Sequence, residues 1–167
     1  LSVAASWGAT LSPDGTRTAY ISDRGGWPQV WVQPVRGRGE ATVVDLGPDP
    51  VVQVRWSGDG EWLACAVAPG GGVKTHAWAV RPTGADPRLL AGAPDEHVVV
   101  GPWSPRGAHL VIAEAAEKPD ADAMCELVDP VTGTRRELAV GHMVTVLDLS
   151  LTERFALLRD GPRGARF

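Results

Sequence analysis

Short apolar stretches alternate with polar turns along the whole chain, and none of them keeps the 3.6-residue period of an amphipathic helix. Residues 51–56, 62–67 and 76–80 are typical, because each consists mostly of apolar residues and has a Gly or Pro within two residues of one end or both. Runs of this length and composition, separated by tight turns, indicate β-strands. The pattern predicts an all-β chain.

One turn recurs at a nearly constant spacing. The segments LSPDG (11–15), WSGDG (56–60) and WSPRG (103–107) share one pattern, and LSLTE (149–153) is a diverged fourth copy. Successive serines of this turn are 45, 47 and 46 residues apart, at positions 12, 57, 104 and 150. The same period appears in two further sets of residues, which are Pro34, Pro82 and Pro130, and Gly47, Gly92 and Gly141. A period of this length indicates a repeat architecture.

Each repeat is predicted to contain four short strands. The expected first strands are 51–56 and 98–103, the second 17–22, 62–67, 109–113 and 155–159, the third 30–33, 76–80 and 125–128, and the fourth 42–45, 88–90 and 136–138. Four antiparallel strands in a repeat of about 45 residues make a blade of a β-propeller. We therefore expect one partial β-propeller of about 3.5 four-stranded antiparallel blades, with blades at 1–47, 48–92 and 93–141 and a half-blade at 142–167.

The seven tryptophans are expected to pack between the blades, since wide flat side chains fill the space between twisted sheets. Trp56 and Trp103 occupy the same position of the repeat, directly before the turn serine. We expect both indoles to lie between neighbouring blades. Leu11 and Leu149 take this position in the other two repeats.

Composition and charge narrow the functional classes. A net charge of -4 and a pI near 5.5 leave no broad basic face, so nucleic acid is not an expected partner. No apolar run reaches the roughly 18 residues needed to cross a bilayer, and the first residues have neither the basic nor the long apolar part of a signal peptide.

Cys65 and Cys125 are too far apart for a metal-ligand pair and are expected to be buried free thiols, with a disulfide left open. These features favour a reducing, cytoplasmic location.

No residue is predicted to be catalytic or to bind a cofactor or metal. The four histidines are scattered along the chain, at positions 76, 97, 109 and 142. Asp120 and Asp122 lack the further ligands of a calcium loop, and residues 70–74 (GGGVK) lack the P-loop spacing and open no expected helix. We interpret the first pair as a solvated turn and the second segment as a mobile loop between strands.

The remaining acidic residues of interest are expected to have structural roles. Asp14 and Asp59 should accept hydrogen bonds from the backbone of their own turns. Asp23-Arg24 and Arg159-Asp160 follow the second strands of the first and fourth repeats and are expected to form weak ion pairs in loops.

The repeat resembles that of TolB-type (WD40-like) propellers, and longer segments are similar to the N-terminal propeller of the prolyl oligopeptidase (S9) family of serine peptidases. The segments that carry this resemblance are LSPDGTRTAYISDR (11–24), QVWVQP (29–34), VRWSGDGEWLA (54–64), VAPGGG (67–72) and LDLS (147–150). In that family the propeller has no catalytic residue and caps an α/β-hydrolase domain that cleaves short peptides or related esters and amides. The sequence agrees in one respect, because it has no Gly-x-Ser-x-Gly motif.

Three hypotheses follow from this resemblance. The chain is the non-catalytic propeller segment of an S9-type serine peptidase, and it limits access of peptide substrates to a hydrolase domain absent from residues 1–167. Alternatively, it is a stand-alone TolB-like scaffold for binding. A third hypothesis is that two copies form a homodimer with twofold symmetry that closes one seven-bladed ring.

Overall fold

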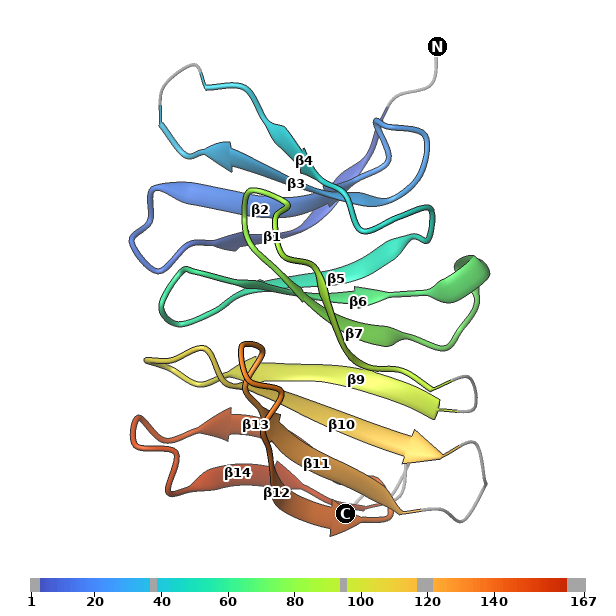
Figure 1. Cartoon of the computed structure of the whole chain (residues 1–167), viewed down its shortest axis with the longest axis vertical. Helices are drawn as coiled ribbons and strands as arrows, with labels where there is room; N and C mark the ends of the chain where they lie inside the picture. Colours follow the sequence, from blue (N-terminus) through green and yellow to red (C-terminus); the bar gives the residue numbers. More distant parts are fainter. Residues whose placement is uncertain (1–3, 37–38, 94–95, 117–121, 162–167) are drawn as a thin grey trace.

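The computed structural model describes residues 4–36, 39–93, 96–116 and 122–161 (Figure 1). The described residues form three four-stranded antiparallel sheets and one two-stranded sheet, each with its strands in chain order. The strands are β1 (Ser6–Leu11), β2 (Arg17–Ser22), β3 (Gln29–Pro34) and β4 (Thr42–Val44); β5 (Val51–Trp56), β6 (Leu63–Val67), β7 (His76–Val80) and β8 (Arg88–Ala91); β9 (Glu96–Trp103), β10 (Leu110–Ala116), β11 (Ala123–Val128) and β12 (Arg135–Gly141); β13 (Thr145–Leu149) and β14 (Ala156–Arg159).

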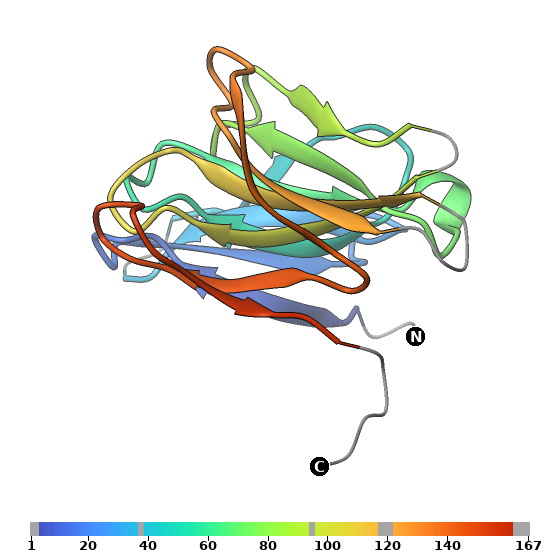
Figure 2. The same ribbon diagram turned by 90° about the horizontal axis from the view of Figure 1, so that it is seen from below.

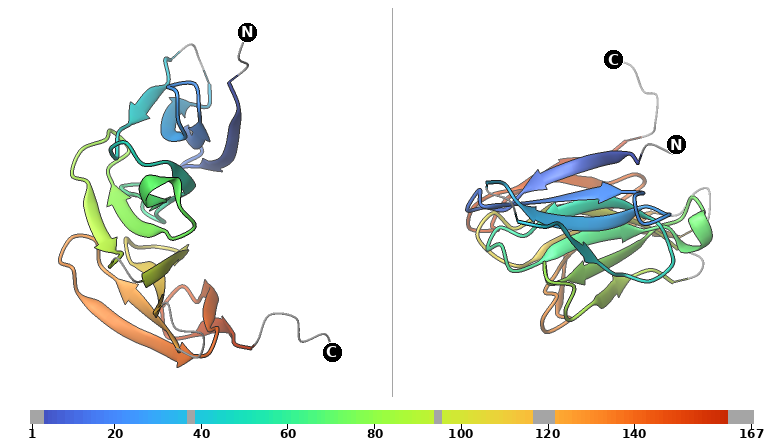
Figure 3. Two further views of the ribbon diagram at one scale, coloured as in Figure 1. Left: turned by 90° about the vertical axis from the view of Figure 1, so that its right-hand side faces the viewer. Right: turned by 90° about the horizontal axis from the view of Figure 1, so that it is seen from above.

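The sheets stack face to face along an arc, which Figure 3 shows from the side. Figure 2 looks along this stack and shows that each sheet is twisted and overlaps the next. Blades that follow each other around an open arc are the arrangement of a partial propeller. The predicted fold, an all-β partial propeller of four-stranded antiparallel blades, is confirmed.

The turn serine closes the connection between the first and second strands of each sheet. The Ser57 N–H donates to Trp62 O at 2.9 Å, and the Trp62 N–H donates to Ser57 Oγ at 2.9 Å. The N–H groups of Ser104 and Ser150 make the same bond to the carbonyls of His109 and Phe155. Because these partners belong to the turn, the second strands of the last three sheets begin one residue later than the sequence predicted, at Leu63, Leu110 and Ala156.

The aspartates of the first two turns hold the turn backbone, as predicted. Asp14 Oδ1 accepts from the Thr16 N–H at 3.0 Å and from Ser12 Oγ at 2.5 Å, and Asp59 Oδ1 accepts from the Glu61 N–H at 3.0 Å. The hydrogen bond from Ser12 is the main reason that the pKa of Asp14 falls to about 2, with smaller contributions from Thr16 and Arg17. The ionised carboxylate therefore stabilises this turn.

We expect Asp14 to titrate with a pKa near 2 in the folded protein. Since this pKa is lower than in the unfolded chain, the carboxylate adds stability above its ordinary pKa and loses this effect as the pH falls through the folded value. An NMR titration of the Asp14 carboxyl carbon measures the pKa. Ser12→Ala should raise it, whereas Ser57→Ala, in another turn, should leave it unchanged; an unshifted pKa in Ser12→Ala would contradict the assignment.

Three apolar clusters lie between successive sheets. The first joins the sheets of β1–β4 and β5–β8, the second joins β5–β8 to β9–β12, and the third joins β9–β12 to β13. Alternate residues of one strand serve different clusters, so Cys65 on β6 belongs to the first and Ala64 and Ala66 to the second. This division follows from the period of two in a β-strand. Each complete sheet in the middle of the arc is therefore buried on both faces.

Two tryptophans occupy equivalent positions between sheets. Trp56 Nε1 donates to Thr10 O at 3.2 Å, and Trp103 Nε1 donates to Arg55 O at 3.1 Å. Each acceptor is a residue of the preceding sheet's first strand, two positions before the turn serine. Both indoles are buried, with 7% and 8% of the residue surface exposed. The predicted packing of this pair is confirmed, and each indole also satisfies a strand carbonyl of its neighbour.

The expectation that all seven tryptophans pack in the interior is wrong for two of them. Trp7, on β1, and Trp27, in the connection between β2 and β3, are each 40% exposed. Trp62, by contrast, is 1% exposed and lies under the guanidinium of Arg81 at 3.9 Å. Sequence position therefore predicts the role of Trp56 and Trp103 but not that of every tryptophan.

Other local expectations need correction. A 3-10 turn, η1 (Pro69–Gly71), forms where no helix was expected, and its Gly70 N–H donates to Asp49 Oδ1 at 2.8 Å. Gly47, Gly92 and Gly141 recur at one position of the repeat but differ in structure. Gly47 and Gly92 have positive φ angles, whereas Gly141 is the last residue of strand β12. The strand is longer than predicted because β11 pairs with it over its whole length.

The expected ion pairs Asp23-Arg24 and Arg159-Asp160 do not form. Asp23 Oδ1 accepts from the Ala5 N–H at 2.7 Å, and Arg24 stacks over Trp31 at 3.4 Å from the ring centre. Asp160 Oδ1 accepts from the Met143 N–H at 3.3 Å. Adjacent side chains at the end of a strand point in different directions, so each meets another partner.

Candidate functional site

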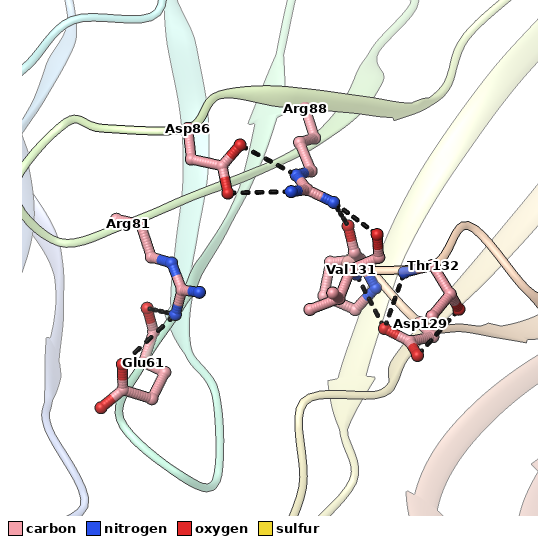
Figure 4. A network of polar contacts seen from close by, with 8 residues as sticks. Glu61, Arg81, Asp86, Arg88, Asp129, Val131 and Thr132 are labelled. Carbon is pink, nitrogen blue, oxygen red and sulfur yellow. Dashed lines mark hydrogen bonds and ion pairs between the residues drawn. The ribbon is translucent and has the colours of Figure 1, made fainter.

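The turns between first and second strands and the hairpins between third and fourth strands project at the same end of each sheet. We call this end the turn face. It carries a chain of polar contacts, which Figure 4 shows for the second and third sheets. Arg81 Nη1 lies 3.2 Å from Glu61 Oε2, and Arg88 lies 3.0 Å from Asp86 Oδ2. Both ion pairs lie within the second sheet and its turns.

A pocket of about 340 Å³ opens on the turn face beside the last two sheets. We call it the Arg136 pocket. The β11–β12 hairpin, the strands that it joins, the turn before β10 and the β13–β14 turn all contribute to its wall. The lining residues are His109, Leu127, Asp129, Thr132, Thr134, Arg136 and Glu153.

Glu153 joins the two sheets that form the pocket. Its carboxylate lies 3.0 Å from His109 Nδ1 and 3.7 Å from Arg136 Nη2. Its backbone is left-handed, with φ 55°, at the repeat position where the first two turns have Gly15 and Gly60. A side chain is unfavourable in this conformation, and such strain occurs often at functional sites.

Both carboxylates of the pocket are held in the ionised form. Burial by itself would raise the pKa of Glu153, but hydrogen bonds from Ser104 and His109 and the charge of Arg136 hold it below its ordinary value. Burial likewise opposes ionisation of Asp129, whose pKa is lowered by the Val131 N–H and by Thr132. The carboxylates therefore already have donors from this chain.

The donors of the pocket are less fully used. The contacts of Arg136 within the described structure involve Nη2, which approaches Glu153 Oε2 and donates to Glu153 O at 3.4 Å. His109 is already engaged, because its Nδ1 faces Glu153 at 3.0 Å. A guanidinium has five N–H donors, so the Arg136 pocket is suited to a ligand that supplies oxygen acceptors.

The structure combines few of the residues considered from sequence. Of the four histidines, only His109 lines the pocket. The ring of His76 packs so closely against Gly92 that a Cβ atom on residue 92 would lie 2.4 Å from it. His97 and His142 are exposed. Asp120 lies outside the described residues, and Asp122 is exposed. The described residues contain no group of three or more His, Cys, Asp or Glu arranged to bind a metal.

Sequence analysis missed Glu153 and Arg136. A signal for the first was present, because a glutamate replaces glycine in the recurring turn. Its partner His109 is 44 residues away in sequence, however, and no local pattern relates the two.

The cysteines are free and buried, as predicted. Burial raises the pKa of the Cys65 thiol to about 12 and also raises that of Cys125. A nucleophilic cysteine needs a thiolate, so these two thiols are suited to packing instead. None of the described segments forms a helix long and apolar enough to cross a membrane.

Comparison with known proteins identifies the fold. No protein-family model matches the sequence, and no curated protein is similar to it. Among solved structures, a protein described as TolB from Agrobacterium tumefaciens is 21% identical, with a TM-score of 0.62; the match covers 83% of this chain and 50% of that one. The chain thus spans half of that TolB structure.

Peptidases have the same fold over a smaller part of their length. Oligopeptidase B from Trypanosoma brucei matches with a TM-score of 0.66 and 12% identity over 82% of this chain and 20% of its own. A protein described as a dipeptidyl aminopeptidase IV from Bacteroides ovatus matches with a TM-score of 0.68 and 10% identity over 93% of this chain and 26% of its own.

The described architecture is therefore that of TolB-like propellers and of the N-terminal propeller domains of S9 peptidases. Two oligogalacturonate lyases also have this fold, at 12% and 17% identity. The likeness to these structures consequently defines the fold and leaves the chemistry to be argued from the residues.

Proposed function

We propose that this chain is the non-catalytic propeller segment of an S9-type serine peptidase. In this role it would limit which peptides reach an α/β-hydrolase domain outside residues 1–167. The observation that carries the proposal is the match of nearly the whole chain to a fifth or a quarter of the length of peptidases.

The chemistry of the described residues supports a non-catalytic role. The hydroxyls of Ser12 and Ser57 donate to Asp14 and Asp59 within their own turns. In a Ser-His-Asp triad the serine hydroxyl donates to a histidine base instead. The buried thiols of Cys65 and Cys125 support a reducing compartment, and a cytoplasmic location remains our prediction.

A stand-alone TolB-like binding scaffold is the second candidate. The match to half of a TolB structure supports it, since this is a larger share than the fifth or quarter of the two peptidases described above. The two functions differ in one respect that can be measured, which is whether the full-length gene product contains a reactive serine.

We expect a fluorophosphonate probe, which labels activated serines, to label the full-length gene product at a site outside residues 1–167. Purified residues 1–167 should remain unlabelled and should not hydrolyse chromogenic peptide esters, because the hydroxyls of Ser12, Ser57 and Ser104 are hydrogen-bonded to carboxylates within the chain. Mass spectrometry of the labelled peptide locates the site. An unlabelled full-length product would reject the peptidase and favour the scaffold, and labelling within residues 1–167 would reject both.

A second assay tests access control. The full-length product should hydrolyse short peptides much faster than a long unfolded protein such as casein. Equal rates on the two substrates would show that the propeller does not filter by size.

A further inference from the structure

A second pocket lies on the concave side of the arc, where the first strands of the sheets end. The left view of Figure 3 shows the first strands on this side and the fourth strands on the convex side. We call it the Arg55 pocket, and its volume is about 270 Å³. Its walls do not depend on the last sheet of the arc, because the residues that form them belong to the first three sheets and their turns. Among them are Thr10, Arg55, Trp56, Pro102, Trp103 and Pro105.

The tryptophans and prolines of this pocket form apolar walls. Trp56 Nε1 and Trp103 Nε1 both donate to strand carbonyls of the preceding sheet. Since an indole has one N–H donor, neither ring has a polar group left for a ligand. Pro102 and Pro105 have no N–H group and add further apolar surface. These four residues are therefore suited to contact an apolar group.

Arg55 adds a cation to these apolar walls. Its backbone is held in place, because Arg55 O accepts from Trp103 Nε1 at 3.1 Å. The residue is exposed, and within the described part of the chain its guanidinium forms neither a hydrogen bond nor an ion pair. Arg81, Arg88 and Arg135, by contrast, each pair with a carboxylate of this chain. The five N–H donors of the Arg55 guanidinium therefore remain for a ligand.

The blade architecture does not require an arginine at this position. Arg55 lies two residues before its turn serine, and the same position of the other repeats holds Thr10, Pro102 and Asp148. Asp148 does not neutralise Arg55, because the whole third sheet lies between them and Asp148 Oδ1 accepts from the Leu149 N–H at 2.8 Å. The cation of the pocket thus has no structural partner and no counterpart in the other repeats.

We propose that the Arg55 pocket binds a peptide carboxylate that has an apolar group beside it. A guanidinium binds a carboxylate through two parallel N–H···O bonds, and the tryptophan and proline walls would cover the apolar group. The pocket is smaller than the roughly 300–1,000 Å³ of sites that enclose a whole small ligand, so it would hold one residue of a longer chain.

Two parts of a peptide have this chemistry. One is an apolar C-terminal residue with its free carboxylate, and the other is an acidic side chain next to an apolar residue. The inference deepens the proposed function and rests on it in one respect, which is that the carboxylate belongs to a peptide. The preference for a carboxylate follows from the pocket itself.

Two pairs of peptides test the proposal and separate the two sources of the carboxylate. Acetyl-Gly-Phe and its amide differ in the C-terminal charge, and the amides of acetyl-Gly-Glu-Phe and acetyl-Gly-Gln-Phe differ in the side-chain charge. Binding to residues 1–167 is followed by NMR through the indole N–H resonances of Trp56 and Trp103, which line the pocket. We expect at least one charged peptide to shift both resonances and to bind about tenfold or more tightly than its neutral partner. The pair that shows this difference identifies the source.

Arg55→Gln should weaken binding of the charged peptide to the level of its neutral partner and change the melting temperature by less than about 2 °C, because the side chain is exposed. Arg55→Lys keeps the charge without the two parallel donors and should retain part of the binding. Arg159→Gln is the matched control, since it removes an exposed arginine outside the pocket and should bind as the unchanged chain does.

The proposal is overturned if neither charged peptide binds more tightly than its neutral partner, or if Arg55→Gln and Arg159→Gln bind the charged peptide equally well. Fluorophosphonate labelling of the full-length product tests the peptidase separately. Failure of the carboxylate site and failure of the proposed function therefore appear in different measurements.

Discussion

Trp103→Ala is expected to lower the free energy of unfolding by about 3–5 kcal/mol, the usual cost of truncating a large buried aromatic side chain. The indole is 8% exposed and belongs to the apolar cluster between the second and third sheets. Its removal leaves a cavity and deprives Arg55 O of the N–H that lies 3.1 Å away. Both effects weaken the same contact between blades.

Urea unfolding followed by far-UV circular dichroism measures this loss. Trp103→Phe keeps most of the ring but not the hydrogen bond, and should cost about 1–2 kcal/mol. Trp27→Ala is the matched control, because this tryptophan is 40% exposed, and it should cost less than about 1 kcal/mol. If Trp103→Ala and Trp27→Ala are equally destabilising, Trp103 does not join the sheets in the way described.

Arg135→Ala is expected to destabilise the fold by about 2–4 kcal/mol, because it leaves two nearly buried carboxylates without their cation. Arg135 Nη1 lies 2.7 Å from Glu114 Oε1 and 2.5 Å from Glu126 Oε2, whose side chains are 15% and 11% exposed. Arg135 Nη2 also donates to Leu90 O of the preceding sheet at 2.5 Å. The residue therefore connects three strands of one blade to the blade before it.

The same unfolding assay separates charge from packing. Adding Glu126→Gln to Arg135→Ala should recover part of the loss, because it removes one of the unpaired charges. Arg159→Ala, at an exposed position, should change stability by less than about 0.5 kcal/mol. A double variant as unstable as the sum of its single variants would indicate that Arg135 and Glu126 do not interact.

The blades and their turns could be predicted from sequence because both depend on residues close together in the chain. Alternating apolar residues define a strand locally, and the Ser-x-Asp-Gly segment of the first two turns contains the hydroxyl and carboxylate that hold its own backbone. The recurrence of the turn then set the number of blades in the described arc. The position of Trp56 and Trp103 before this turn was sufficient to predict their burial between sheets.

The Arg136 pocket and the difference among tryptophans were decided by the tertiary structure. Glu153 meets His109 across 44 residues, and Arg88 meets Pro130 across 42, because separate sheets pack face to face in a fixed register. Trp7 and Trp27 are each 40% exposed whereas Trp56 and Trp103 are buried, a difference that no local pattern contains. Sequence periodicity determines what each blade is, whereas contacts between blades depend on how whole sheets stack, and only the folded chain fixes that stacking.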